Sequence, residues 1–191
     1  LNAFLLLVIT SQLFSSLPDN PSLRDVLLLF PKASNELMAF IEQVMRTDSP
    51  LSIGQRELLA TFVSSLNSCQ FCYGAHLAFS RAFGIEDDKI ASLLQDIESA
   101  SIEEELKPLF RYVKKLTLEP SKIQRKDAEE VFQAGWSELA LFDAVQVCSL
   151  FNMMNRLVDG TGVKPETVNT DLDQQELKAL REIQYTQYNA T

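Results

Sequence analysis

The chain has 191 residues, of which 46% are hydrophobic and 23% are charged. This is enough to bury one substantial core but is short for two full domains. The formal net charge is −9, and no basic stripe offsets it, so the composition argues against nucleic acid and against an anionic membrane surface as partners.

The first residues predict an arm on the domain. The apolar run at residues 3–9 is short, has no basic residues before it and is followed by no clear small-residue cleavage site. No other stretch approaches the length needed to span a bilayer. We therefore expect an N-terminal arm over residues 1–20 that packs on the domain or on a neighbouring copy. With an odd number of cysteines and no export signal, a cytoplasmic location is expected.

The remaining pattern is helical, and it predicts an all-α, single-domain helical bundle over residues 21–163. The C-terminal tail, residues 164–191, is polar and is expected to be partly helical, flexible or partner-bound. Ser52 and Ser137 are predicted N-caps, and Gly84 and Gly160 are predicted to end helices. The expected helices, in chain order, cover residues 23–30, 34–46, 53–67, 69–83, 86–97, 102–116, 126–134, 138–159 and 172–185.

The segment 69–76 gathers two of the three cysteines and the only histidine. On a helix, Cys69, Cys72 and His76 share one face. If Asn67 or Ser68 is the N-cap, both sulfurs lie in the first turn, where free N–H groups and the helix dipole favour a thiolate. His76, one turn further on, can exchange a proton with Cys72 near neutral pH. The segment therefore combines an attacking sulfur, a resolving sulfur and a proton carrier.

Other interpretations of these residues stay open. Paired cysteines can be ordinary core residues, and a single histidine is often structural. A structural zinc site needs four ligands, and the sequence has no second C-x-x-C and no further histidine. A catalytic zinc held by two cysteines and one histidine ranks below dithiol redox chemistry, so we expect neither a metal nor a cofactor.

Glu57 is the candidate acid partner of this segment. It enters the predicted helix 53–67, which is apolar on most sides and should be buried, although an acid in an early turn can simply complement the helix dipole. At about 1.5 Å per residue, Glu57 lies roughly 16 Å before the turn at Ser68 and His76 roughly 12 Å after it. If the two helices fold back on each other, the carboxylate can orient the imidazole.

These residues carry a family resemblance. An acid twelve positions before C-x-x-C-x-x-x-H resembles the alkylhydroperoxidase D core of the carboxymuconolactone decarboxylase superfamily. The segments 52–58, 67–76 and 151–160 are more specifically similar to its peroxidase-related subgroup. The resemblance covers about residues 17–163.

The resemblance implies a fold and a chemistry. Cys72 would attack a hydroperoxide and become a sulfenic acid, Cys69 would resolve it as a disulfide, and an external thiol donor would reduce that disulfide. His76 and Glu57 would relay the proton, and the protein would be a homo-oligomer. The prototype has an extra histidine just before the second cysteine, where this chain has Phe71, which implies a poorer relay. Decarboxylation is not implied, because the decarboxylases proper lack the cysteine pair.

Two features of the predicted helix 138–159 have separate interpretations. Cys148 lies in an apolar run and is expected to be a buried, inert thiol. A polar edge on the same helix has two interpretations. It is a functional cluster, near the dithiol or at a subunit interface, or it is an internal ion pair, such as Arg156 with Asp159, beside solvated amides. Its members are Asn152, Asn155, Arg156 and Asp159.

The expected function is a peroxidase-like thiol oxidoreductase that reduces an alkyl or hydrogen peroxide through a dithiol/disulfide cycle. Its catalytic residues would be Cys72, Cys69, His76 and Glu57, and its partners the peroxide, a thiol or disulfide reductant and further copies of the chain. One alternative is a thiol–disulfide oxidoreductase or redox sensor with little peroxide turnover. Another is a non-catalytic helical scaffold with inert cysteines.

Overall fold

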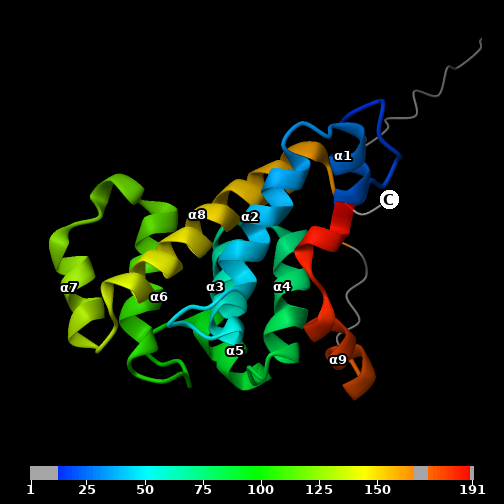
Figure 1. Ribbon diagram of the computed structural model, residues 1–191. Helices are drawn as coiled ribbons and strands as arrows, with labels where there is room; N and C mark the ends of the chain where they lie inside the picture. The colour runs from blue at the N-terminus through cyan, green and yellow to red at the C-terminus, as the bar shows by residue number, and fades with distance from the viewer. Residues whose placement is uncertain (1–12, 166–171, 190–191) are drawn as a thin grey trace, which may run out of the picture.

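A computed structural model describes residues 13–165 and 172–189, and within these ranges the chain is entirely helical (Figure 1). The all-α prediction is therefore confirmed. The apolar run at residues 3–9 and most of the predicted arm lie outside the described residues. The α-helices are α1 (Leu23–Leu29), α2 (Ser34–Arg46), α3 (Ile53–Leu66), α4 (Gln70–Ala82), α5 (Asp87–Gln95), α6 (Leu106–Leu118), α7 (Arg125–Gln133), α8 (Glu138–Thr161) and α9 (Gln174–Glu182), with short 3₁₀ turns η1 (Pro120–Lys122) and η2 (Tyr185–Asn189).

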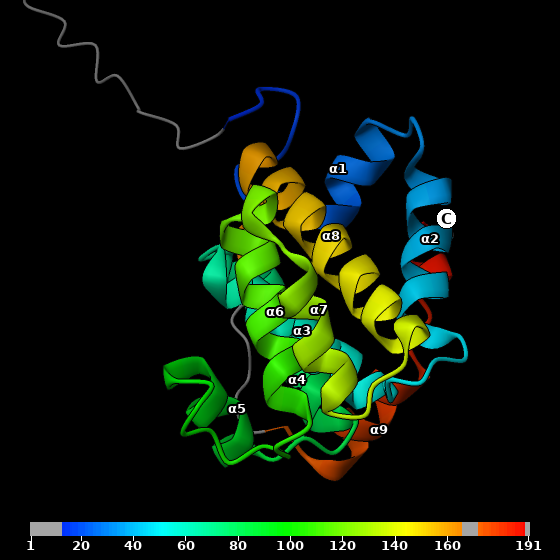
Figure 2. The ribbon, with the colours of Figure 1, turned by 90° about the vertical axis from the view of Figure 1, so that its left-hand side faces the viewer.

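The core forms around α3, which packs against α4, α6 and α8. Every residue from Arg56 to Ser64 is buried, in keeping with the nearly all-apolar circumference of this helix. Helix α8 is the longest element and runs diagonally across the molecule, with α6 and α7 at its N-terminal half and α1 near its C-terminal end (Figures 1 and 2). No helix in the described part of the chain combines the length and the apolarity that crossing a bilayer requires.

Local sequence signals fix several helix ends. The Ser52 hydroxyl accepts the Gln55 N–H, and the Gln55 side chain accepts the Ser52 N–H, which forms the capping box of α3. Ser137 caps α8 by accepting the Ala140 N–H. Gly84 follows α4 with a positive φ of 90°, as predicted.

The predicted bounds of α5, α6 and α9 differ from the observed ones by up to four residues, and two predicted capping positions are wrong. Asn67 is the C-cap of α3 and Ser68 adopts a left-handed φ of 59°, so the N-cap of α4 is Cys69 itself. Helix α8 continues through Gly160 and ends at Thr161, because Gly162, with a φ of 78°, supplies the left-handed residue that terminates it.

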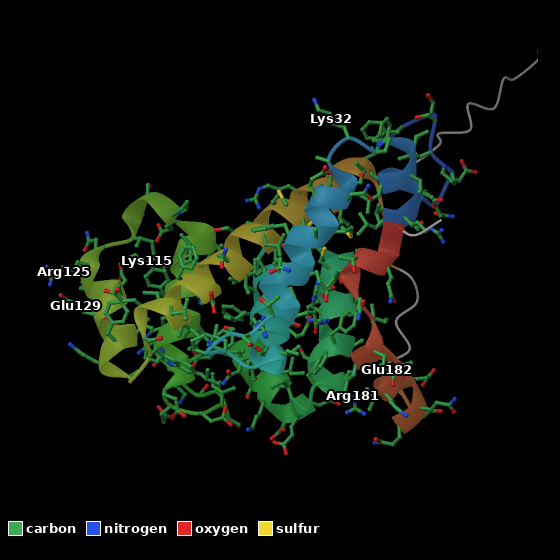
Figure 3. The ribbon with its side chains drawn as sticks, viewed as in Figure 1. Lys32, Lys115, Arg125, Glu129, Arg181 and Glu182 are labelled. Atoms are coloured by element: carbon green, nitrogen blue, oxygen red, sulfur yellow. The ribbon has the colours of Figure 1, made fainter. Side chains whose placement is uncertain are left out.

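Charged side chains make contacts both between helices and within them. Lys115 of α6 contacts Asp127 of α7 at 2.6 Å, and Arg125 pairs with Glu129 one turn along the outside of α7 at 2.7 Å (Figure 3). Arg181 on α9 donates to the backbone carbonyl of Ala82 at 3.1 Å. The last contact ties the C-terminal segment to the end of α4.

Candidate dithiol site

The site is built on the hairpin of α3 and α4, which pack against each other along their lengths. Glu57 comes from the second turn of α3 and is completely buried. Its Oε2 lies 2.6 Å from Nδ1 of His76, in the second turn of α4. The two helices thus fold back on each other as expected from the sequence, and the acid and the imidazole are in direct contact.

Glu57 is held between two nitrogen donors. Its Oε1 accepts a hydrogen bond from Nη1 of Arg46 at 2.5 Å, and the Tyr185 hydroxyl lies 3.4 Å from the same oxygen. Burial alone would raise the pKa of Glu57, but the attraction of His76 and Arg46 outweighs it and holds the pKa below its ordinary value. Glu57 is therefore ionised at neutral pH.

The ionised carboxylate fixes the histidine tautomer. A carboxylate only accepts hydrogen bonds, so Nδ1 of His76 carries the proton in this contact and Nε2 is the basic nitrogen. The imidazole also packs edge-on against the Phe151 ring, with centroids 4.2 Å apart. Glu57 and Phe151 together define the orientation of His76.

Arg46 and Tyr185 were not predicted as site residues. The Arg46 guanidinium lies 4.8 to 5.3 Å from the ring centroids of Phe79, Phe83 and Tyr185. Its Nε and Nη2 atoms make no hydrogen bond, so the aromatic faces take the place of polar partners. Burial and the charge of Glu57 raise the pKa of the Tyr185 phenol well above its usual value, which keeps its hydroxyl a donor.

The two cysteines are free thiols at the start of α4, and both are buried, with Cys69 0% and Cys72 3% exposed. A hydrogen bond between them, in which Cys72 acts as the donor, lowers the pKa of Cys69. The same bond, together with burial, raises the pKa of Cys72. The pair therefore loses its first proton more readily from Cys69 than from Cys72, and the second proton is held more tightly.

The polar edge of α8 lies partly beside the dithiol. Asn155 is 1% exposed, donates to the Ser64 hydroxyl at 3.0 Å and accepts from Asn67 at 2.9 Å. Its side chain also hydrogen-bonds Cys72, which by itself lowers the pKa of that thiol, whereas the charge of Asp159 raises it. Of the two interpretations, the cluster near the dithiol is the one supported for Asn155.

The alternative for this edge was an ion pair between Arg156 and Asp159. No such pair occurs among the ion pairs of the described residues; Arg156 instead donates to the backbone and side-chain oxygens of Asn152 at 2.6 and 3.0 Å. Cys148 is buried 3.3 Å from the Thr117 hydroxyl, and burial raises its pKa. Its environment agrees with the expectation of an unreactive thiol.

A cavity of about 560 Å³ opens beside the site. Cys72 and His76 contribute to its wall, whereas Cys69 does not. Most of the remaining lining is apolar and comes from α4, α8 and the C-terminal segment, including Phe71, Phe79, Phe151, Met154, Leu180 and Ile183. Within residues 13–165 and 172–189, no group of three or more histidine, cysteine or acidic side chains is placed to hold a metal ion.

Comparisons with known proteins agree with the fold. The model of the carboxymuconolactone decarboxylase family matches residues 31–114, which include the acid, both cysteines and the histidine. A search of curated proteins found no match. Among solved structures, the chain is similar to a protein from Ralstonia eutropha JMP134 described as an alkylhydroperoxidase AhpD core and uncharacterized peroxidase-related protein. The TM-score is 0.70 at 20% identity, over 74% of this chain and 75% of that one.

Two further structures are similar. An uncharacterized peroxidase-related protein from Silicibacter sp. TM1040 matches with a TM-score of 0.70 and 25% identity, over 75% of each chain. A protein of unknown function from Agrobacterium tumefaciens, named for antioxidant defence and AhpD, matches with a TM-score of 0.63 and 20% identity, over 74% of this chain and 96% of that one. Residues 31–114 match the carboxymuconolactone decarboxylase family over less than half of the chain, and the described residues have the alkylhydroperoxidase D-like helical fold.

Proposed function

We propose that the protein is a dithiol peroxidase in which Cys72 reduces a hydroperoxide and Cys69 resolves the product. The observation that carries this proposal is the position of Cys72 and His76 on the wall of one cavity, with His76 held by the ionised Glu57. Cys69 lies one turn before Cys72 and shares a hydrogen bond with it, so it is close enough to form a disulfide after modest movement.

The proposed cycle balances in three steps. The Cys72 thiol and ROOH give a Cys72 sulfenic acid and ROH, as the sulfur attacks the outer oxygen and the O–O bond breaks. The Cys69 thiol then attacks the sulfenic sulfur, which forms the Cys69–Cys72 disulfide and releases water. Two equivalents of an external thiol, or one dithiol, reduce this disulfide and are themselves oxidised to a disulfide.

His76 carries the proton in the first step. The neighbouring Cys69 and burial raise the pKa of Cys72, so its thiol must lose a proton before the sulfur attacks. Nε2 of His76 accepts this proton and returns it to the alkoxide that leaves the peroxide. Glu57 holds Nδ1 throughout, which stabilises the transient imidazolium without taking a proton.

Two observations favour competing functions. The raised pKa of Cys72 and the presence of Phe71 instead of a second histidine favour a thiol–disulfide oxidoreductase or redox sensor with slow peroxide turnover. The nearly complete burial of both sulfurs favours a non-catalytic scaffold.

Thiol titration separates the three functions. A peroxidase loses two thiols per chain when an alkyl hydroperoxide is added, a sensor loses them only to a small disulfide, and a scaffold keeps them in both cases. Cys72→Ser should abolish sulfenic acid formation and Cys69→Ser should let it accumulate, while Cys148→Ser, the matched control, should behave as wild type. Identical behaviour of the Cys72 and Cys69 variants would contradict the assigned roles.

A further inference from the structure

We propose that the C-terminal segment, residues 172–189, determines substrate specificity at the dithiol site. It forms one wall of the cavity beside Cys72 and adapts the site to neutral hydroperoxides with a sizeable apolar group, in preference to hydrogen peroxide. The kinetic test of this proposal rests on the proposed peroxidase function, whereas the binding test does not. The family model ends at residue 114, so it assigns nothing to this segment.

Tyr185 anchors the segment on the acid of the site. Its backbone N–H donates to Glu42 of α2 at 2.6 Å, its ring covers the Arg46 guanidinium at 4.8 Å, and its hydroxyl lies 3.4 Å from Glu57. Phe79 of α4 contacts the same ring, with centroids 6.2 Å apart. The segment is therefore attached to the residues that orient His76.

A second anchor lies on α9. Arg181 donates to the carbonyl of Ala82 at the end of α4, and α9 lies along α4 (Figures 1 and 3). Helix α9 has nine residues, fewer than an isolated helix needs for stability in water, so it depends on its Asp173 capping box and on packing against α4. The two anchors hold the stretch between them across the cavity.

Residues beside and between the anchors present apolar side chains to the cavity. Leu180 and Ile183 line it together with Phe71, Phe151 and Met154. No lysine or arginine occurs in the lining contributed by the described residues, and its one carboxylate, Glu176, is on α9. A substituent with a negative charge would therefore find no counterion, whereas a neutral hydrocarbon group would be buried against apolar carbon.

The size of the cavity favours a large substituent. Water occupies about 30 Å³ in the liquid, and hydrogen peroxide is only somewhat larger, so neither fills about 560 Å³ of mainly apolar space. The volume falls in the range of pockets that bind small organic ligands. Each methylene buried there improves binding by about fourfold at most, an advantage that hydrogen peroxide cannot obtain.

The kinetic test compares cumene hydroperoxide with hydrogen peroxide in the full-length protein. Wild type should show a ratio of kcat/KM values of about ten or more in favour of cumene hydroperoxide. Leu180→Ala and Ile183→Ala should each lower this ratio about threefold to tenfold. Leu177→Ala, the same change on α9 at a leucine that does not line the cavity, should leave the ratio unchanged. A wild-type ratio at or below one, or a ratio that neither cavity variant lowers, would overturn the proposal.

If neither peroxide is consumed, the proposed peroxidase function is wrong, but the role of the C-terminal segment in ligand selection can still be tested by binding. The alcohol 2-phenyl-2-propanol has the apolar group of cumene hydroperoxide but cannot oxidise a thiol. It should slow the alkylation of Cys72 in wild type and in Leu177→Ala, and slow it about threefold to tenfold less effectively in Leu180→Ala. Equal protection in all three proteins, or none in wild type, would show that the C-terminal wall does not select an apolar ligand.

Discussion

Glu57→Gln should destabilise the protein strongly, because the substitution keeps the shape of the side chain but removes its charge. The carboxylate is completely buried, and Arg46, whose side chain is only 9% exposed, loses the counterion that it contacts at 2.5 Å. Two nitrogens of Arg46 already lack hydrogen bonds, and the Met45 carbonyl, which accepts from Nη1 at 3.2 Å, carries no charge that could replace the carboxylate. Removing one partner of a buried ion pair typically costs about 3–5 kcal/mol. For a chain of this size that loss lowers Tm by roughly 6–20 °C.

The assay is a double-mutant cycle of Glu57→Gln with Arg46→Met, followed by thermal and chemical unfolding. Glu57→Gln should lose about 3–5 kcal/mol, because it leaves the buried charge of Arg46 without its partner. Arg46→Met should lose less, because His76 still contacts Glu57 at 2.6 Å. The double variant removes both charges, so its loss should be smaller than the sum of the two by about 1–3 kcal/mol. Glu42→Gln is a control that removes another charge near the site, keeps an oxygen that can accept the Tyr185 N–H and leaves both members of the Arg46–Glu57 contact in place. Additive losses would show that the contact does not hold Glu57 in its ionised form.

Four further outcomes are expected. The pKa of Glu57 is lower in the folded protein than its ordinary value of 4.5. Its contribution to stability is therefore fully present above pH 4.5 and is lost as the pH falls through the folded pKa. Urea unfolding across pH should show that the stability difference between wild type and Glu57→Gln shrinks in acid. His76→Ala should slow Cys72 alkylation near neutral pH, and an unchanged rate profile against pH would mean that the imidazole only fills space. Asn155→Leu removes a hydrogen bond that lowers the pKa of Cys72, so the alkylation of Cys72 should slow. It also leaves the Asn67 amide and the Ser64 hydroxyl with one partner fewer, so the free energy of unfolding should fall by about 1–3 kcal/mol. Alkylation kinetics and denaturant unfolding measure the two effects. The exposed side chains of Leu139, Phe142 and Met153 on α8 are consistent with the expectation of a homo-oligomer from the sequence. Light scattering should detect the oligomer, and a strictly monomeric mass would contradict it.

Helical periodicity and caps predicted much of the fold because both are local. The pattern over residues 34–46 gave the bounds of α2 without error, and Ser52 and Ser137 cap α3 and α8 as expected. The start of α4 was misplaced because Asn67 and Ser68 are both good capping residues. The left-handed conformation of Ser68 is imposed by the reversal between two packed helices, and the sequence carries no separate signal for it.

The contact between Glu57 and His76 could be predicted because one short turn joins their helices. Arg46 and Tyr185 reach Glu57 from α2 and from the polar C-terminal segment, 11 and 128 residues away in the chain. Arg46 is the last residue of α2, where a basic side chain is favourable without any further partner. Tyr185 lies in a segment whose composition resembled a tail. The aromatic side chain of Tyr185 within a polar segment was a signal that this residue packs on the domain. Its contact with Glu57 could not be identified without the tertiary fold.

The most direct test of dithiol peroxidase chemistry is the stoichiometry of a single turnover. Reduced protein is mixed with one equivalent of cumene hydroperoxide in the absence of a reductant, and the alcohol product and the cysteine peptides are quantified together by mass spectrometry. One alcohol should form for each Cys69–Cys72 disulfide, with Cys148 still a free thiol. Intact hydroperoxide with all three thiols unmodified, or a disulfide that includes Cys148, would contradict the proposed chemistry.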